Sequence, residues 1–343
     1  MDRGPWSAGR WLALAALTTM ALGVVMRWAM AAGLELPVPF KQVRHAHSHL
    51  GYYALLFPLS WLVWVTLGER PPRRWLRWVY GTASVAAAVG FLRAGYGPLA
   101  IAGSTVVGLL WVASGWRLRG RLRRWDDPMG SVPVGTTVAM LVVPMVAVTL
   151  RRDPVLANAL VASFLATMLL LVFVPSALRA GQVSLGPWPL LVGLGLLSAA
   201  ALGPWPLVVT RAGLLGYGVL LGERVLRSGR LDGPTRGGWL VVAAGSVVLA
   251  LGGPALLRRD VAVASLHFLV LGPLLVSFAH RFVEGFGARL AAAAIGAAGA
   301  MSLAIVAAGY GGGRWASWAS ALLGTVVLLL WSAVAVRLLR SGR

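Results

Sequence analysis

The chain has 343 residues, of which 58% are hydrophobic and only 12% charged, about half the charged share of an average soluble domain. Its net charge of +21 comes from short arginine clusters between apolar runs. That pattern is typical of loops that orient a membrane protein, and it argues against nucleic-acid binding. The sequence contains no cysteine, which excludes disulfides, thiolate metal ligands and thiol catalysis within it.

Apolar runs close to the roughly 20 residues that cross a bilayer recur along the whole sequence. They are continuously apolar rather than alternating, so we predict an all-α integral membrane protein with one polytopic transmembrane domain over residues 1–343. The two runs after residue 186 each begin with Gly-Pro-Trp-Pro, which suits a helix start with an interfacial anchor. The twelve expected spans are 11–34, 46–68, 75–93, 96–116, 131–150, 154–177, 187–203, 204–222, 238–258, 261–283, 288–310 and 315–338.

The basic residues orient these spans. Most of the 31 Lys and Arg residues fall in alternate segments, namely the two ends of the chain and every second loop. Cytoplasmic loops of membrane proteins are enriched in Lys and Arg, so both termini are expected in the cytoplasm. The expected location is the inner (cytoplasmic) membrane of the cell, as a multi-pass protein.

Histidine is concentrated where a polar loop meets the second expected span, at His45, His47 and His49. In the expected topology this end of the span shares the outer third of the membrane with His267, in the tenth span. Neutral imidazole is a strong iron ligand and is tolerated among apolar helices when its second nitrogen is hydrogen-bonded. We therefore expect these two places to face each other and to bind a b-type haem, an apolar disc with two carboxylates.

Helical geometry restricts which of the three clustered histidines binds one iron. At about 100° per residue, His45 and His49 share a face and His47 points nearly the opposite way. One haem then recruits either His47 or one of the other two. If the stretch is extended, its period of two brings all three to one side, and His45, His47, His49 and His267 become candidate ligands of copper or zinc. A third interpretation is that they only begin a helix in the polar interface.

Arginines within membrane spans are functional candidates by default. Arg27 in the first span and Arg211 in the eighth both map to the outer half, and Arg314 lies in the outer loop before the last span. Each is a candidate to neutralise haem carboxylates through charge-assisted hydrogen bonds. The alternative is that Arg27 extends to the outer surface and Arg211 bonds to a helix carbonyl.

Twelve spans with histidines in the second and tenth resemble subunit I of the haem–copper oxidases. The histidine-rich stretches, with their His-x-His-Leu and Gly patterns, are similar to those of short oxidase-like and NnrS-type membrane proteins. The matching segments are residues 45–51 (HAHSHLG) and 265–272 (SLHFLVLG). In that family one histidine from each of these helices holds the low-spin haem. The resemblance implies that His267 and either His47 or His49 do so here, and Pro58 favours His47. It also implies that Arg27 lies against this haem and that Arg314 binds a propionate.

The sequence departs from the oxidases at the oxygen-reducing centre. Where they have a His-x-His pair in the tenth helix, the first position here is Ser265. Spans 154–177 and 187–203 contain no histidine to bind copper, and acidic residues fall in loops or at span edges. The resemblance thus implies an oxidase-like scaffold that keeps at most the low-spin site and is not a complete terminal oxidase.

The expected function is electron transfer, or redox or gas sensing, by a bis-histidine haem in the lipid bilayer, with a redox protein as a possible partner. Two occupied axial positions favour electron transfer. One alternative is a transporter for a small or anionic solute, with Arg27 and Arg211 lining a central cavity. Another is a membrane protein whose histidine-bound copper or zinc activates water, for which Glu35 is the nearest carboxylate.

Overall fold

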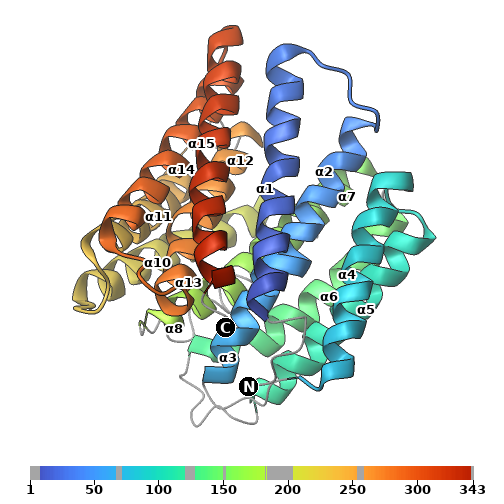
Figure 1. Ribbon diagram of the computed structural model, residues 1–343, viewed down its shortest axis with the longest axis horizontal. Helices are drawn as coiled ribbons and strands as arrows, with labels where there is room; N and C mark the ends of the chain where they lie inside the picture. Colours follow the sequence, from blue (N-terminus) through green and yellow to red (C-terminus); the bar gives the residue numbers. More distant parts are fainter. Residues whose placement is uncertain are drawn as a thin grey trace.

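The structure, a computed structural model, describes residues 8–66, 72–119, 128–149, 152–181, 183, 204–252 and 259–340 (Figure 1). These residues are almost entirely helical and include no strand. Within the described residues, six helices are long and apolar enough to cross a membrane, as in an all-α, multi-pass membrane protein. Their bounds are Gly9–Ala32, Pro98–Arg119, Gly233–Leu251, Asp260–Phe282, Ala288–Gly309 and Gly313–Leu339.

The described helical elements follow in chain order. They are α1 (Ala8–Ala32), α2 (Phe40–Leu50), η1 (Gly51–Leu56), α3 (Phe57–Thr66), α4 (Arg74–Ala94), α5 (Pro98–Arg119), η2 (Pro128–Gly130), α6 (Ser131–Thr149), α7 (Pro154–Met168), η3 (Leu169–Phe173), α8 (Val174–Ala180), α10 (Pro204–Arg227), α11 (Gly233–Leu251), α12 (Arg259–Leu269), η5 (Val270–Leu274), α13 (Leu275–Phe282), α14 (Ala288–Gly309) and α15 (Gly313–Arg340). The expected span 187–203 lies outside the described residues, as do the last residues of 46–68, 131–150 and 238–258.

Two helices begin earlier than hydropathy predicts. The helix that carries the clustered histidines starts at Phe40 rather than at residue 46, so the cluster is helical and not extended. Helix α11 starts at Gly233 rather than at residue 238, because the Asp232 side chain accepts a hydrogen bond from the Thr235 N–H at 3.0 Å and a proline occupies the first turn. The first turns of both helices contain polar residues (Lys41, Gln42 and Arg44 in α2, Thr235 and Arg236 in α11), so a search for apolar runs places both helix starts too late.

Three long helices contain a π-helical segment near the middle. The segments are η1, η3 and η5, which join α2 to α3, α7 to α8 and α12 to α13. A proline lies two residues after η1 and after η3, and Pro273 lies inside η5. Proline has no N–H and clashes with the carbonyl four residues earlier, so each of these helices has to rearrange its hydrogen bonds at this point.

At Pro58 and Pro175, a side chain from another helix binds the carbonyl that the proline leaves free. The carbonyl of Ala54, four residues before Pro58, accepts a hydrogen bond from Trp11 Nε1 at 3.1 Å. The carbonyl of Leu171, four residues before Pro175, accepts one from Ser131 Oγ at 2.7 Å. Within a bilayer an unsatisfied carbonyl is costly, so these contacts hold the interrupted helices in fixed positions.

We expect a Ser131→Ala substitution to destabilise the protein by about 1–2 kcal/mol, because it leaves the buried Leu171 carbonyl without its donor. The measurement is the thermal midpoint of the purified protein in detergent. A matched control is Ser246→Ala, whose hydroxyl donates only to Val242 O in its own helix. Equal midpoints for the two variants would contradict a role for the Ser131 contact in stability.

The first and last helices lie side by side, and the three interrupted helices meet at one end of the bundle. Helix α1 packs along α15, and α8 contacts both α3 and α13 at the end where α1 begins and α15 ends (Figure 1). Helix α2 packs against α1 and α4, whereas α12 packs against α14. The histidine-bearing halves α2 and α12 are thereby held by long helices toward the opposite end.

Candidate functional site

His47 on α2 and His267 on α12 lie opposite each other, although more than two hundred residues separate them. Their ring centroids are 6.4 Å apart and their ring planes differ by only 10°. Both side chains are half-buried. The structure thus brings together one histidine from each of the two segments that the sequence singles out.

Both rings are held through the same nitrogen. His47 Nδ1 lies 2.7 Å from the backbone oxygen of Thr19, and His267 Nδ1 lies 2.7 Å from that of Val263. A carbonyl oxygen only accepts hydrogen bonds, so each Nδ1 carries the proton and each Nε2 keeps its lone pair. A second hydrogen bond of this kind orients a metal-binding imidazole and raises its basicity.

The spacing of the two rings agrees with that of two axial ligands of one iron. Metal–nitrogen bonds of about 2.0 Å to two opposed imidazoles place the ring centroids about 6.3 Å apart. The observed separation is 6.4 Å, with nearly parallel rings. The separation of the ring centroids, with a lone pair on each Nε2, therefore fits two imidazoles that share one haem iron.

Helix α1 positions His47 in two ways: the Thr19 carbonyl accepts a hydrogen bond from its ring, and Gly23, which has no side chain, leaves room for that ring. Thr19 supplies the oxygen that holds Nδ1, and Gly23 lies one turn later on the same face. A Cβ at Gly23 would lie 2.9 Å from His47 Cε1, closer than side-chain carbons normally approach. A Cβ at Gly51 would lie 3.2 Å from the Thr19 methyl group, so glycine also allows the close contact of this helix with the histidine-bearing one. Small residues at such contacts are typical of membrane helix pairs.

The tenth expected span bends just after His267. Helix α12 ends at Leu269, and Gly272 within the following π segment has φ −92° and ψ −111°, outside the helical region. The Phe268 ring packs near Gly272 and Gly299, where no side chain occupies the space. The histidine thus belongs to the regular half of the span and is held by its own helix.

Arg27 lies near the histidine pair. Its Nη1 donates a 2.7 Å hydrogen bond to Ser320 Oγ on α15, and its charge is close enough to act on both His47 and His267. Arg211 is half-buried, and its Nε has no hydrogen-bond partner among the described residues. Arg314 is exposed at the start of α15. Of the three expected arginines, the structure brings only Arg27 to the pair.

His45 and His49 occupy the other face of α2. The His49 ring stacks on Phe91 at 3.9 Å between centroids, and His45 lies 5.0 Å from the ring of Tyr96. Burial, together with the positive charges of Arg44 and Lys41, lowers the pKa of His45 to about 4, so this imidazole is neutral near pH 7.

The helix therefore separates the clustered histidines. His47 faces His267, and the other two face α4. No group of three or more His, Asp or Glu side chains is arranged to hold a metal ion within the part of the chain that the structure describes.

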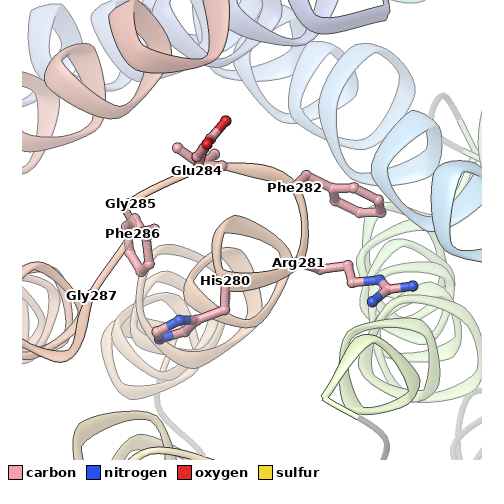
Figure 2. Close-up of a pocket in the computed structure, with 8 residues that line it drawn as sticks. His280, Arg281, Phe282, Glu284, Gly285, Phe286 and Gly287 are labelled. Carbon is pink, nitrogen blue, oxygen red and sulfur yellow. The ribbon is translucent and has the colours of Figure 1, made fainter. Parts of the chain in front are cut away.

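A second polar cluster lies at the other end of the tenth expected span. His280 Nε2 lies 3.2 Å from Asp232 Oδ2, and these side chains border a cavity of about 260 Å³. A second cavity, of about 430 Å³, lies along the turn that follows α13. Figure 2 shows the His280 ring beside that of Phe286, with Arg281 pointing away from both. His280 belongs to α13 and Asp232 caps α11, so no local sequence pattern pairs the two residues.

No protein-family model matches the chain, and comparisons with the curated proteins and with the solved structures return no similar protein. The function therefore has to be inferred from the chemistry of these residues.

Proposed function

We propose that the chain is a b-type haem protein of the membrane in which His47 and His267 are the two axial ligands of a low-spin iron. The observation that carries the proposal is the 6.4 Å separation of two nearly parallel imidazoles, each bonded to a carbonyl through Nδ1. The scaffold is a bundle of twelve spans with both termini in the cytoplasm, resembling subunit I of the haem–copper oxidases. Its membrane is the inner membrane.

Each residue of the site has a separate role. The two Nε2 atoms bind iron, and the backbone oxygens of Thr19 and Val263 fix the orientation of the rings. The Arg27 guanidinium, which uses one nitrogen to bind Ser320, offers further donors to a haem carboxylate. We assign no carboxylate contact to Arg314. When bound, haem supplies one-electron oxidation and reduction.

Electron transfer is the activity that such a site supports best. With both histidines bound to iron, a haem would have no ligand position open for oxygen, and gas sensing would require one histidine to dissociate. Ser265, at the position where an oxidase has a further ligand, is exposed. A copper centre beside the haem also needs three clustered ligands, and the described residues offer no such group. The electron donor or acceptor is a second redox protein.

The transporter alternative makes a different prediction about Arg27. That function predicts a central cavity lined by Arg27 and Arg211, away from the histidines. The two cavities described above contain neither arginine, and Arg27 lies beside the histidine pair.

The test is a reduced-minus-oxidised absorption spectrum of the purified full-length protein, with haem quantified as its pyridine complex. We expect a b-type band and one haem per chain. In a variant with His47, His49 and His267 all replaced by alanine, we expect the band to be absent. A wild-type protein without haem, or an unchanged band in the triple variant, would refute the proposal.

A further inference from the structure

The cavity of about 260 Å³ beside His280 is a polar site that the haem does not use. It lies among α8, the start of α11 and the end of α13, at the end of the bundle where α1 begins and α15 ends (Figure 1). Cavities that enclose whole drug-sized ligands measure roughly 300–1,000 Å³. This cavity therefore suits a small molecule, or the headgroup of a larger one.

Two oxygen atoms at the start of α11 lack a hydrogen-bond donor, and both residues border this cavity. The Thr235 side chain is only 1% exposed, and no described residue hydrogen-bonds to its Oγ1. Asp232 Oδ1 accepts a hydrogen bond from the Thr235 N–H, but Oδ2 has none, because His280 Nε2 at 3.2 Å lacks the alignment for one. A buried acceptor without a donor costs free energy. These two oxygens therefore point to a ligand that donates hydrogen bonds.

Positive charge lies at the rim of the same cavity. Arg230 and Arg281 both border it, and both are exposed. Arg281 and His280 extend in different directions from the end of α13 (Figure 2). Guanidinium groups bind phosphate through charge-assisted hydrogen bonds. With a half-buried carboxylate inside and guanidinium groups at the rim, the cavity complements a ligand that carries both an ammonium and a phosphate group.

The position of the cavity favours a lipid as the source of these two groups. The candidate membrane spans Gly233–Leu251 and Asp260–Phe282 have one end each at the cavity, next to Asp232 and Arg281. The ends of spans lie where the polar headgroups of a bilayer begin. A headgroup can therefore enter the cavity while its acyl chains stay in the hydrocarbon region.

We propose that this cavity binds the headgroup of phosphatidylethanolamine. The ammonium group donates hydrogen bonds to Asp232 Oδ2 and Thr235 Oγ1, and the phosphate lies against the arginines at the rim. Phosphatidylcholine has the same charges but no N–H to donate, and phosphatidylglycerol has no positive charge to pair with the carboxylate. The site therefore distinguishes among these three lipids.

The test is native mass spectrometry of the full-length protein in detergent, with each of the three lipids, carrying the same acyl chains, added alone. We expect phosphatidylethanolamine to bind at least roughly tenfold more tightly than the other two, as one hydrogen bond to a charged group accounts for. Asp232→Asn and Thr235→Val should each remove most of this preference. Asparagine is also a good helix cap and valine has the size of threonine, so neither change should disturb α11.

The matched control is Thr105→Val, since the Thr105 hydroxyl donates to Ile101 O in its own helix. This variant should bind as the wild type does. Arg281→Gln should weaken the binding of all three lipids, because each carries a phosphate. The thermal midpoint of each variant separates loss of the site from loss of the fold.

Three outcomes would overturn the proposal: equal binding of the three lipids, an unchanged preference in an Asp232→Asn, Thr235→Val double variant, or equal loss in Thr105→Val. Free phosphoethanolamine that bound as tightly as the lipid would refute the choice of a lipid. The result is independent of the haem, because a protein without haem that still prefers phosphatidylethanolamine would refute only the proposed function.

Discussion

Alanine in place of either His47 or His267 should abolish the low-spin b-type spectrum. Each substitution removes one of the two paired imidazoles, so only one proposed iron ligand would remain. Removing an outer-shell partner of a metal ligand typically costs roughly 10–100-fold in affinity, and loss of the ligand itself should cost more. The measurement is haem per chain together with the reduced spectrum of each variant.

Two other histidines provide matched controls. His49→Ala changes the opposite face of α2, and His280→Ala changes the far end of the tenth expected span. Both variants should keep the wild-type band. Free imidazole added to His47→Ala should restore a low-spin spectrum, because it refills the vacated position without repairing the chain. If His49→Ala lost haem and His47→Ala kept it, the ligand assignment would be wrong.

The helical period accounts for much of what could be predicted about the site. The sequence shows that His45 and His49 share a face and that His47 does not, and the structure places the first two beside Phe91 and His47 beside His267. This step needs only the repeat of the α-helix. The sequence left open whether the stretch is helical at all, since a histidine cluster at a loop boundary also suits an extended chain.

Features that depend on contacts between distant segments were not predictable in this way. The carbonyl of Thr19 and the missing side chain of Gly23 position His47, but a threonine and a glycine within an apolar run have no distinguishing pattern. The π segments are a similar case. Proline predicts a disturbed helix, but only the packed structure shows that Trp11 binds the carbonyl of Ala54.

The pairing of His280 with Asp232 shows a different limit of sequence analysis. Asp232 is recognisable as a helix cap, since a proline and a threonine follow it closely. The second carboxylate oxygen of Asp232 contacts His280 from another helix, and the sequence around neither residue predicts that contact. Predictions from single segments find the donors and acceptors of a site but do not pair them.

A Gly23→Ala substitution tests whether α1 positions the iron ligand. The new Cβ would lie 2.9 Å from His47 Cε1, so the imidazole has to tilt away and its 2.7 Å hydrogen bond to the Thr19 carbonyl weakens. No ligand atom is removed, so the effect should resemble loss of an outer-shell partner. We expect haem affinity to fall by roughly 10-fold or more. Haem titration of the stripped protein measures this affinity.

The control for this variant is Gly296→Ala on α14, where a new Cβ meets no atom within 4 Å. Both changes add one methyl group within a helix, and alanine has the higher helix propensity, so neither is expected to unfold its helix. A fall in affinity confined to Gly23→Ala then isolates the contact with His47. Equal affinity in the two variants would mean that the ring adapts to the added methyl group, and the α1 contact would no longer explain how this ligand is oriented.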